Sequence, residues 1–187
     1  MSKQDVDIEI SRALNVWANV TKLSFQQLNS GPVHIDIRFE DENIWPYWES
    51  MLVKIALGDT CNAMCSSWIR WEDGEHGDGD PFDGVGGTLA HAYFPVYGGD
   101  AHFDNSERWT LKGHSGTNLL QTAAHEFGHS LGLSHSSRHG ALMAPFYRGY
   151  QAECSSRSPK ISIGKIEQQQ PVLIIKNTRL ALEQGFI

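Results

Sequence analysis

The sequence predicts an α+β fold, and three patterns along the chain support this prediction. Residues 2–21 have the apolar spacing of an amphipathic helix, residues 33–39 alternate strictly between apolar and polar side chains, and residues 118–132 read as a second helix. The length of 187 residues is typical of one domain, and 40% hydrophobic with 20% charged residues is the composition of a globular chain.

The first predicted helix has a clear start. Ser2 and Asp5 have the spacing of a capping box, in which each side chain accepts a hydrogen bond from the other residue's backbone N–H. The residues that recur at helical spacing, and so define its buried face, are Val6, Ile10, Ala13, Leu14 and Trp17. In the second helix, Asn118 is the candidate N-cap and Gly132 the stop signal.

A short internal repeat interrupts the chain after the predicted strand. The residues IRFED at 37–41 return as IRWED at 69–73, and the stretch 41–72 carries four of the six tryptophans. We therefore predict that 33–39 forms a strand of the sheet and that 41–72 is an insertion that loops out from it. Residues 47–57 are predicted to form a short helix within this insertion.

Charge and cysteine content limit the function. Fifteen basic against 22 acidic residues give a net charge of -7, which argues against a nucleic-acid partner. No apolar run approaches the roughly 18–20 residues that cross a bilayer. The odd cysteine count (Cys61, Cys65 and Cys154) and the lack of a signal-peptide core fit either a cytosolic protein or a piece of a longer secreted one.

The strongest chemical signal lies on the second predicted helix, where residues 125–135 read HEFGHSLGLSH. Because residues four apart share a helix face, His125 and His129 can bind one metal ion, and a turn at Gly132 can bring in His135. Three imidazoles leave tetrahedral zinc one open position, which is typical of a catalytic site. Glu126 stands where its carboxylate can reach a zinc-bound water. A helix with coincidental histidines is the alternative interpretation.

Met143 follows in the stretch 141–145, which reads ALMAP. A methionine is most often a packing residue of a core. After a HExxHxxGxxH run, however, it resembles the methionine of the tight turn beneath the metal in metzincin peptidases. We predict that Met143 forms such a Met-turn.

A second group of potential ligands lies in the glycine- and aspartate-rich stretch 73–105 and just beyond it. Singly, each histidine there could be an ordinary core or surface residue. Together, three imidazoles and a carboxylate can fill a closed zinc site, and carboxylates with backbone carbonyls suit calcium. The candidate zinc ligands are His76, Asp78, His91 and His102. The candidate calcium carboxylates are Asp83, Asp104 and Glu107.

These motifs resemble the catalytic domain of matrix metalloproteinases, the matrixin family of metzincin zinc peptidases, over residues 2–40 and 73–150. The resemblance implies a metzincin-like mixed β-sheet with a long N-terminal helix and a central zinc-binding helix. It implies that the three histidines of the long motif bind catalytic zinc, that Glu126 is the general base, and that the second group binds structural zinc. It also implies a calcium site formed by the three carboxylates above and by the carbonyls of Gly84, Gly86 and Thr88.

The resemblance further implies where substrate binds. Leu89 and Ala90 resemble the strand edge that pairs with an extended peptide, and the segment from Pro145 to Tyr147 resembles the wall of the primary specificity pocket. Gln121 resembles the floor of that pocket. A polar residue there indicates a pocket of intermediate depth, although the side chain could equally fold aside.

The chain also departs from the family pattern. The first sheet strand and the closing helix of the family domain have no counterpart, and His34 stands where an aspartate of a second calcium site is expected. We expect residues 1–150 to form the catalytic domain, with 41–72 inserted, and 151–187 to form an atypical, poorly ordered tail.

The function that the resemblance implies is zinc-dependent endopeptidase activity. Such an enzyme hydrolyses peptide bonds of extracellular proteins, matrix components such as collagen among them, through a zinc-bound water and a Glu base. Tissue-inhibitor-type proteins are the implied partners. Calcium sites of this kind suit extracellular calcium levels, so we expect a secreted protein whose signal peptide and propeptide lie outside this chain. The alternative is a non-catalytic, truncated or splice-altered fragment that binds substrate or inhibitor.

Overall fold

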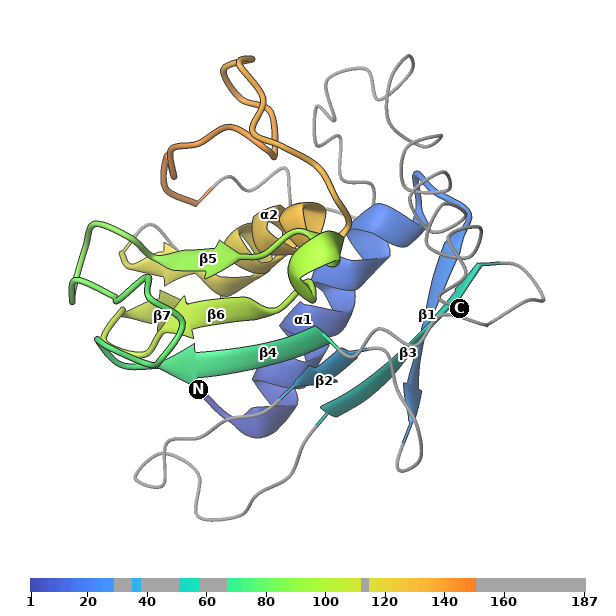
Figure 1. Ribbon diagram of the computed structural model, residues 1–187, viewed down its shortest axis with the longest axis horizontal. Coiled ribbons are helices and arrows are strands. Elements are labelled where there is room, and N and C mark those ends of the chain that lie inside the picture. The colour runs from blue at the N-terminus through green and yellow to red at the C-terminus, as the bar shows by residue number, and fades with distance from the viewer. Residues whose placement is uncertain (29–34, 38–50, 58–66, 112–114, 151–187) are drawn as a thin grey trace, which may run out of the picture.

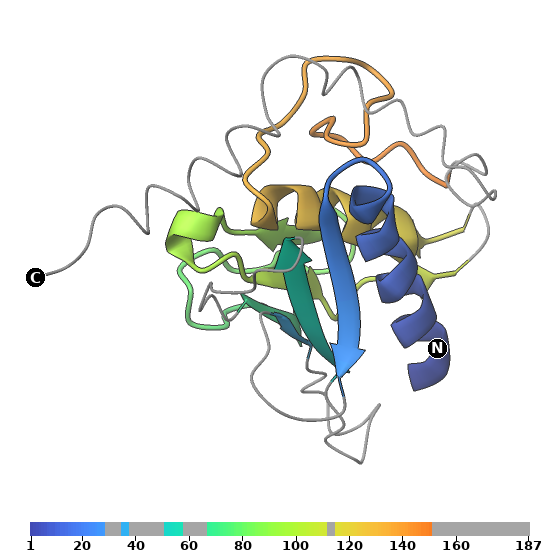
Figure 2. The same cartoon turned by 90° about the vertical axis from the view of Figure 1, so that its right-hand side faces the viewer.

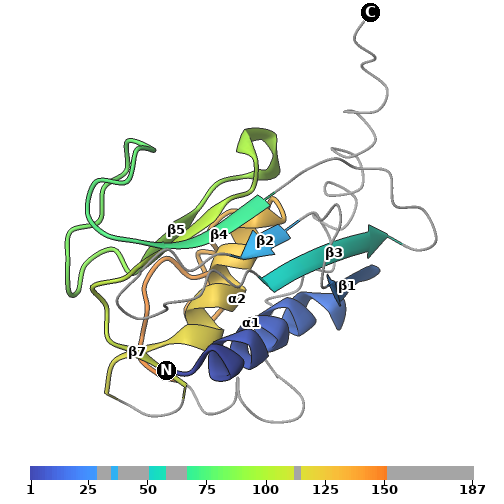
Figure 3. The ribbon, with the colours of Figure 1, turned by 90° about the horizontal axis from the view of Figure 1, so that it is seen from below.

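A computed structural model describes residues 1–28, 35–37, 51–57, 67–111 and 115–150 of the chain. Two helices pack against each other on one side of a mixed sheet (Figures 1 and 3), which confirms the predicted α+β class. The helices are α1 (Lys3–Ala18) and α2 (Leu119–Ser130), with a short 3-10 turn η1 (Pro95–Tyr97). No helix of the described residues is long and apolar enough to span a bilayer.

The six-stranded sheet has the order β1-β3-β2-β4-β6-β5. Its strands are β1 (Leu23–Leu28), β2 (Ile35–Ile37), β3 (Met51–Leu57), β4 (Ser67–Glu72), β5 (Ala90–Ala92) and β6 (Ala101–Asp104). The β2–β4 and β4–β6 pairs are parallel and the others antiparallel. Two further short strands, β7 (Trp109–Thr110) and β8 (Thr117–Asn118), pair in parallel, and β8 leads directly into α2.

Both helices begin where the sequence predicts. The capping box between Ser2 and Asp5 is present at the start of α1, and all five predicted apolar residues of that helix are buried. The Asn118 side chain accepts the Gln121 N–H at 2.9 Å and so caps α2. Figure 2 shows α1 standing next to β1 at one end of the sheet, a strand that the sequence analysis did not predict.

The predicted excursion of residues 41–72 is wrong for the two parts of it that the structure describes, 51–57 and 67–72. Residues 51–57 form strand β3 rather than a helix, and β4, which contains the second copy of the repeat, lies in the sheet between β2 and β6. Ile37, the first residue of the first copy, pairs with Ile69, the first residue of the second copy. Burial alternates along β4, with Ile69 and Trp71 buried on the face toward the helices and Trp68 and Arg70 half-buried on the other face. The predicted strand at 33–39 is confirmed for Ile35–Ile37.

The hydrophobic core lies between the helices and the central strands. Ile69 and Trp71 point inward from β4, and the ring of Trp71 stacks on Phe103 of β6 with centroids 4.8 Å apart. On the outer face, the Arg70 guanidinium lies over the Trp68 ring at 5.1 Å, which explains how a strand with apolar residues on both faces is accommodated. The three cysteines, His34 and the 151–187 tail lie outside the described residues.

Candidate metal centre

The helix α2 and the turn after it bring three histidines together. The Nε2 atoms of His125 and His129 lie 3.1 Å apart, and His135 Nε2 lies 3.3 and 3.2 Å from them. Gly132 adopts a φ of +94°, a left-handed conformation that favours glycine and that turns the chain back so that His135 faces α2.

The hydrogen bonds of the Nδ1 atoms determine that the Nε2 atoms of His125 and His129 face the centre of the cluster. His125 Nδ1 lies 2.7 Å from the Leu142 carbonyl oxygen, and His129 Nδ1 lies 2.7 Å from the Leu133 carbonyl oxygen. A carbonyl oxygen only accepts, so both Nδ1 atoms carry hydrogen and both Nε2 lone pairs point toward the centre. Burial lowers the pKa of His125 to about 4 and also lowers the pKa of His129, with further lowering by the neighbouring imidazoles. Both rings are therefore neutral at pH 7, the form that binds a metal.

Glu126 lies in the wall of the same cleft and is almost fully buried. Burial raises the pKa of its carboxyl to about 8. A carboxyl group whose pKa is moved close to neutrality can both take up and release a proton near pH 7.

Met143 packs directly beneath α2. A Cβ atom at Gly128 would lie 2.3 Å from Met143 Sδ and 2.8 Å from Trp17 Cζ2, so only glycine allows this close packing. The turn is hydrogen-bonded to one candidate ligand and to the neighbour of another. The Leu142 carbonyl accepts from His125, and the Met143 carbonyl accepts the N–H of Ser136, which follows His135, at 2.6 Å.

A second cluster surrounds one oxygen of Asp78. This Oδ2 atom lies 2.7 Å from His76 Nε2, 2.9 Å from His91 Nε2 and 2.8 Å from His102 Nδ1. Burial acts to raise the pKa of Asp78, but the hydrogen bond from the Asp80 N–H and the contacts with the imidazoles outweigh it and lower the pKa well below its usual range.

This second cluster is held from several elements. His91 on β5 and His102 on β6 are directly paired in the sheet. The Gly74 carbonyl oxygen lies 2.8 Å from His76 Nδ1, which fixes the tautomer as it does in the first cluster. The His76 and His91 rings also stack on Phe82, with centroids 4.9 and 4.8 Å away. Three imidazoles and a carboxylate leave no open position on a four-coordinate ion.

The predicted calcium residues lie in neighbouring turns but converge less tightly. Glu107 Oε1 accepts the Gly86 N–H, and Asp83 Oδ1 accepts the Thr88 N–H at 3.0 Å. Asp104 is fully buried, and its Oδ2 has no hydrogen-bond partner among the described residues. Within those residues, only the two histidine clusters bring three or more ligand atoms within 4.8 Å of one another.

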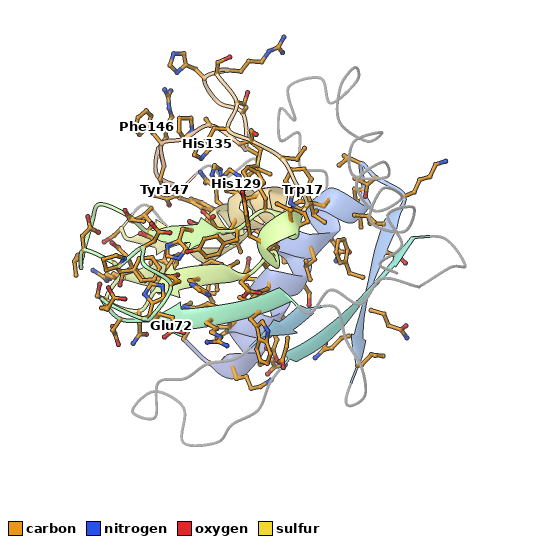
Figure 4. The ribbon with its side chains drawn as sticks, viewed as in Figure 1. Trp17, Glu72, His129, His135, Phe146 and Tyr147 are labelled. Carbon is orange, nitrogen blue, oxygen red and sulfur yellow. The ribbon has the colours of Figure 1, made fainter. Side chains whose placement is uncertain are left out.

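A cleft of about 1110 Å³ runs between the β5 edge, α2 and the segment after the turn. All five residues predicted to bind substrate line it, namely Leu89, Ala90, Gln121, Pro145 and Tyr147. In Figure 4 the side chains of Phe146 and Tyr147 lie on the same side of the molecule as His129 and His135. The Tyr147 hydroxyl accepts the Asn118 N–H at 2.9 Å, and burial raises the pKa of this phenol.

The sequence analysis missed other residues of the cleft wall. Thr122 lines the cleft beside His125, and its position three residues earlier on the same helix face could have indicated this. Phe94 and Arg148 also line the cleft. Nothing in the local sequence marks Phe94, whereas Arg148 directly follows the predicted wall segment and could have been included in it.

A family model and several known proteins match this chain. The matrixin family model (peptidase M10) matches residues 1–47 and 48–160. Over 150 residues the chain is 44% identical to the hatching enzyme of Paracentrotus lividus, covering 80% of this chain and 20% of that protein. It is 40% identical over 169 residues to matrix metalloproteinase-20 of Homo sapiens, covering 89% and 28%. It is 42% identical over 149 residues to interstitial collagenase of Sus scrofa, covering 79% and 25%. The chain thus spans less than a third of the length of these relatives.

Proposed function

The chain belongs to the matrixin family of metalloendopeptidases, and from this premise we propose that it hydrolyses peptide bonds of extracellular proteins. The observation that carries the proposal is that His125, His129 and His135 converge in the wall of a cleft that also contains Glu126. A peptide bond in this cleft can meet a metal and a proton-transfer group together. The substrate-binding roles of Leu89, Ala90, Gln121, Pro145 and Tyr147 are part of the same proposal.

The donor set of the first cluster fits zinc. His125 and His129 direct their Nε2 lone pairs inward, and together with Nε2 of His135 they form a donor set typical of zinc. Three protein ligands leave a coordination position open toward the cleft. Zinc bound there lowers the pKa of a water ligand and polarises a carbonyl oxygen.

Glu126 acts as the general base in this proposal. Burial alone raises the pKa of its carboxyl to about 8, and a cation on the neighbouring imidazoles favours the ionised form. The carboxylate takes a proton from the attacking water and passes it to the leaving amine, so no covalent intermediate with the protein is needed.

The second cluster supports a structural zinc site. Its ligand set, His76, Asp78, His91 and His102, is complete with four donors and leaves no position for substrate. Met143 has a positioning role, since its turn holds His125 and the chain next to His135.

Calcium is proposed for the turns around Asp83, Asp104 and Glu107, with carbonyls of Gly84, Gly86 and Thr88. The support is the buried Asp104 Oδ2 without a partner among the described residues and the all-oxygen chemistry of the donors. Sites of this kind fill at extracellular calcium levels, which supports secretion. Matrix components such as collagen as substrates, and tissue-inhibitor-type proteins as partners, follow from the family alone.

Zinc analysis combined with a cleavage assay tests the proposal. We expect two zinc ions per chain, one for each histidine cluster, and cleavage of a quenched peptide that stops on chelation and returns with added zinc. Full zinc content without cleavage, together with retained inhibitor binding, would instead favour a non-catalytic fragment.

A further inference from the structure

Arg148 gives the cleft a positive charge that the proposed mechanism does not use. Of the residues that the structure describes along the cleft wall, Arg148 is the one with a lysine or arginine side chain. The chain as a whole carries a net charge of -7, so this charge opposes the general field of the protein. Arg148 directly follows Tyr147, whose hydroxyl fixes this part of the wall to Asn118 at the start of α2.

One hydrogen bond orients the guanidinium. Arg148 Nη2 lies 2.8 Å from His139 Nδ1, and because a guanidinium never accepts, His139 must accept through a neutral ring. This bond joins two exposed side chains and uses one of the five N–H donors of Arg148. In the described part of the chain, no other residue bonds the remaining four donors.

No carboxylate of the described residues forms a salt bridge with Arg148. The cleft wall contains a single carboxyl group, Glu126, and it is buried beside the zinc ligands. The positive charge at the rim is therefore available to a group that enters the cleft from solvent. A planar fork of N–H donors matches the two oxygens of a carboxylate.

We propose that Arg148 is a specificity-determining residue that selects peptides with a Glu or Asp side chain close to the scissile bond, where the peptide passes the 145–148 wall. The inference rests on the proposed endopeptidase function and names its substrate class. A substrate carboxylate would accept from the free guanidinium N–H groups while His139 keeps the side chain at the rim. Like charge would disfavour Lys or Arg at the same substrate position.

The test uses quenched peptides that differ only in carrying Glu, Gln or Lys at one of the three positions on either side of the scissile bond. At one position we expect kcat/KM for Glu to exceed that for Gln by about threefold, the size typical of an exposed charge pair, with Lys lower still. Arg148→Gln should abolish the preference, Arg148→Glu should invert it, and rising salt should weaken it in the parent protein.

Arg138→Glu is the matched control. Arg138 is exposed in the same segment but does not line the cleft, so this variant changes the net charge equally and should keep the preference for Glu. Arg148→Lys should retain part of the preference if Arg148→Glu fails to fold.

The outcomes distinguish the role of Arg148 from the proposed endopeptidase function. Cleavage of all peptides at equal rates would overturn the role of Arg148 and leave the endopeptidase function intact. An equal loss of preference in Arg138→Glu and Arg148→Glu would assign the effect to net charge and overturn it as well. No cleavage of any peptide by zinc-loaded protein would overturn the proposed function itself.

Discussion

The two histidine clusters use the same kind of ligand but place their acidic group differently. In the cluster on β5 and β6, Asp78 lies at the centre, and one of its oxygens contacts three imidazoles. In the cluster on α2, Glu126 lies beside the imidazoles in the cleft wall, and three Nε2 atoms face one another with no carboxylate between them.

Under the proposed function, this difference distinguishes a structural metal site from a catalytic one. A carboxylate inside the ligand set completes the coordination and leaves a bound ion no free position. A carboxylate next to the ligand set leaves a position open and remains free to move a proton. The two clusters also differ in their access to the cleft. All three histidines of the cluster on α2 line it, whereas His91 is the one residue of the other cluster that does.

The largest expected effect comes from Glu126→Gln, which removes the base and keeps the side-chain volume. Turnover should fall by about a hundredfold or more, because general base catalysis contributes on that scale. Both zinc ions should stay bound, since Glu126 is not a ligand. The measurements are kcat on a quenched peptide and zinc per chain. Activity within about threefold of the parent would contradict the role of Glu126.

Asp78→Asn should act on stability and metal content. The variant replaces the central charged ligand by an amide, so we expect the loss of one of the two zinc ions and a lower Tm. A broken partner in a buried cluster costs about 1–3 kcal/mol, and each kcal/mol lowers Tm by about 2–4 °C in a domain of this size.

Asp80→Asn is the matched control for this experiment. Asp80 is exposed two residues away and accepts from the Tyr93 hydroxyl rather than from the histidines. The Asp80→Asn variant should keep both zinc ions. If Asp78→Asn also retained two zinc ions, the closed site would not depend on Asp78 as proposed.

Local features of the site could be predicted from the sequence. The capping box at Ser2, the cap at Asn118 and the i, i+4 spacing of His125 and His129 are all properties of adjacent turns, and the structure contains each of them. Family membership, inferred from the HExxHxxGxxH run, is confirmed by the match to the matrixin model.

The arrangement of the strands could not be predicted in the same way. Strand β4 was taken for part of a loop because Trp68 and Ile69 interrupt the expected alternation, although the Arg70 guanidinium covers the Trp68 ring on the half-buried outer face. Strand β1 was missed because Gln26 and Gln27 stand together in it. Arg148 was missed although it directly follows the predicted 145–147 wall, because the sequence does not show that its side chain also lines the cleft.

The two clusters should also respond differently to acid in the metal-free protein. Burial lowers the pKa of His125 from an ordinary value near 6.5 to about 4, so below pH 6.5 the unfolded chain binds a proton that the folded chain does not. Stability should therefore fall as the pH drops from 6.5 toward 4. The pKa of Asp78 is also lowered, but for a carboxylate this contributes stability above pH 3.8, which is lost only at lower pH.

Thermal melts of chelated protein between pH 7 and pH 3 measure these two windows. His125→Asn should remove much of the Tm decrease between pH 6.5 and pH 4. Asp78→Asn should reduce the further Tm decrease below pH 3.8. A Tm that stays constant from pH 7 to pH 4.5 in the parent protein would contradict the buried, neutral state of His125.

The smallest expected effect, Tyr147→Phe, tests whether the open site depends on its wall as well as on its ligands. The change removes only the hydroxyl that accepts the Asn118 N–H, a bond worth about 1 kcal/mol, which corresponds to a Tm lower by about 2–4 °C. Because the bond joins the specificity wall to the start of α2, we expect KM to rise more than kcat falls, with zinc content unchanged. Tyr97→Phe is the matched control, since Tyr97 is exposed on η1 and does not line the cleft. An equal change in both variants would show that the Tyr147 hydroxyl does not position the wall.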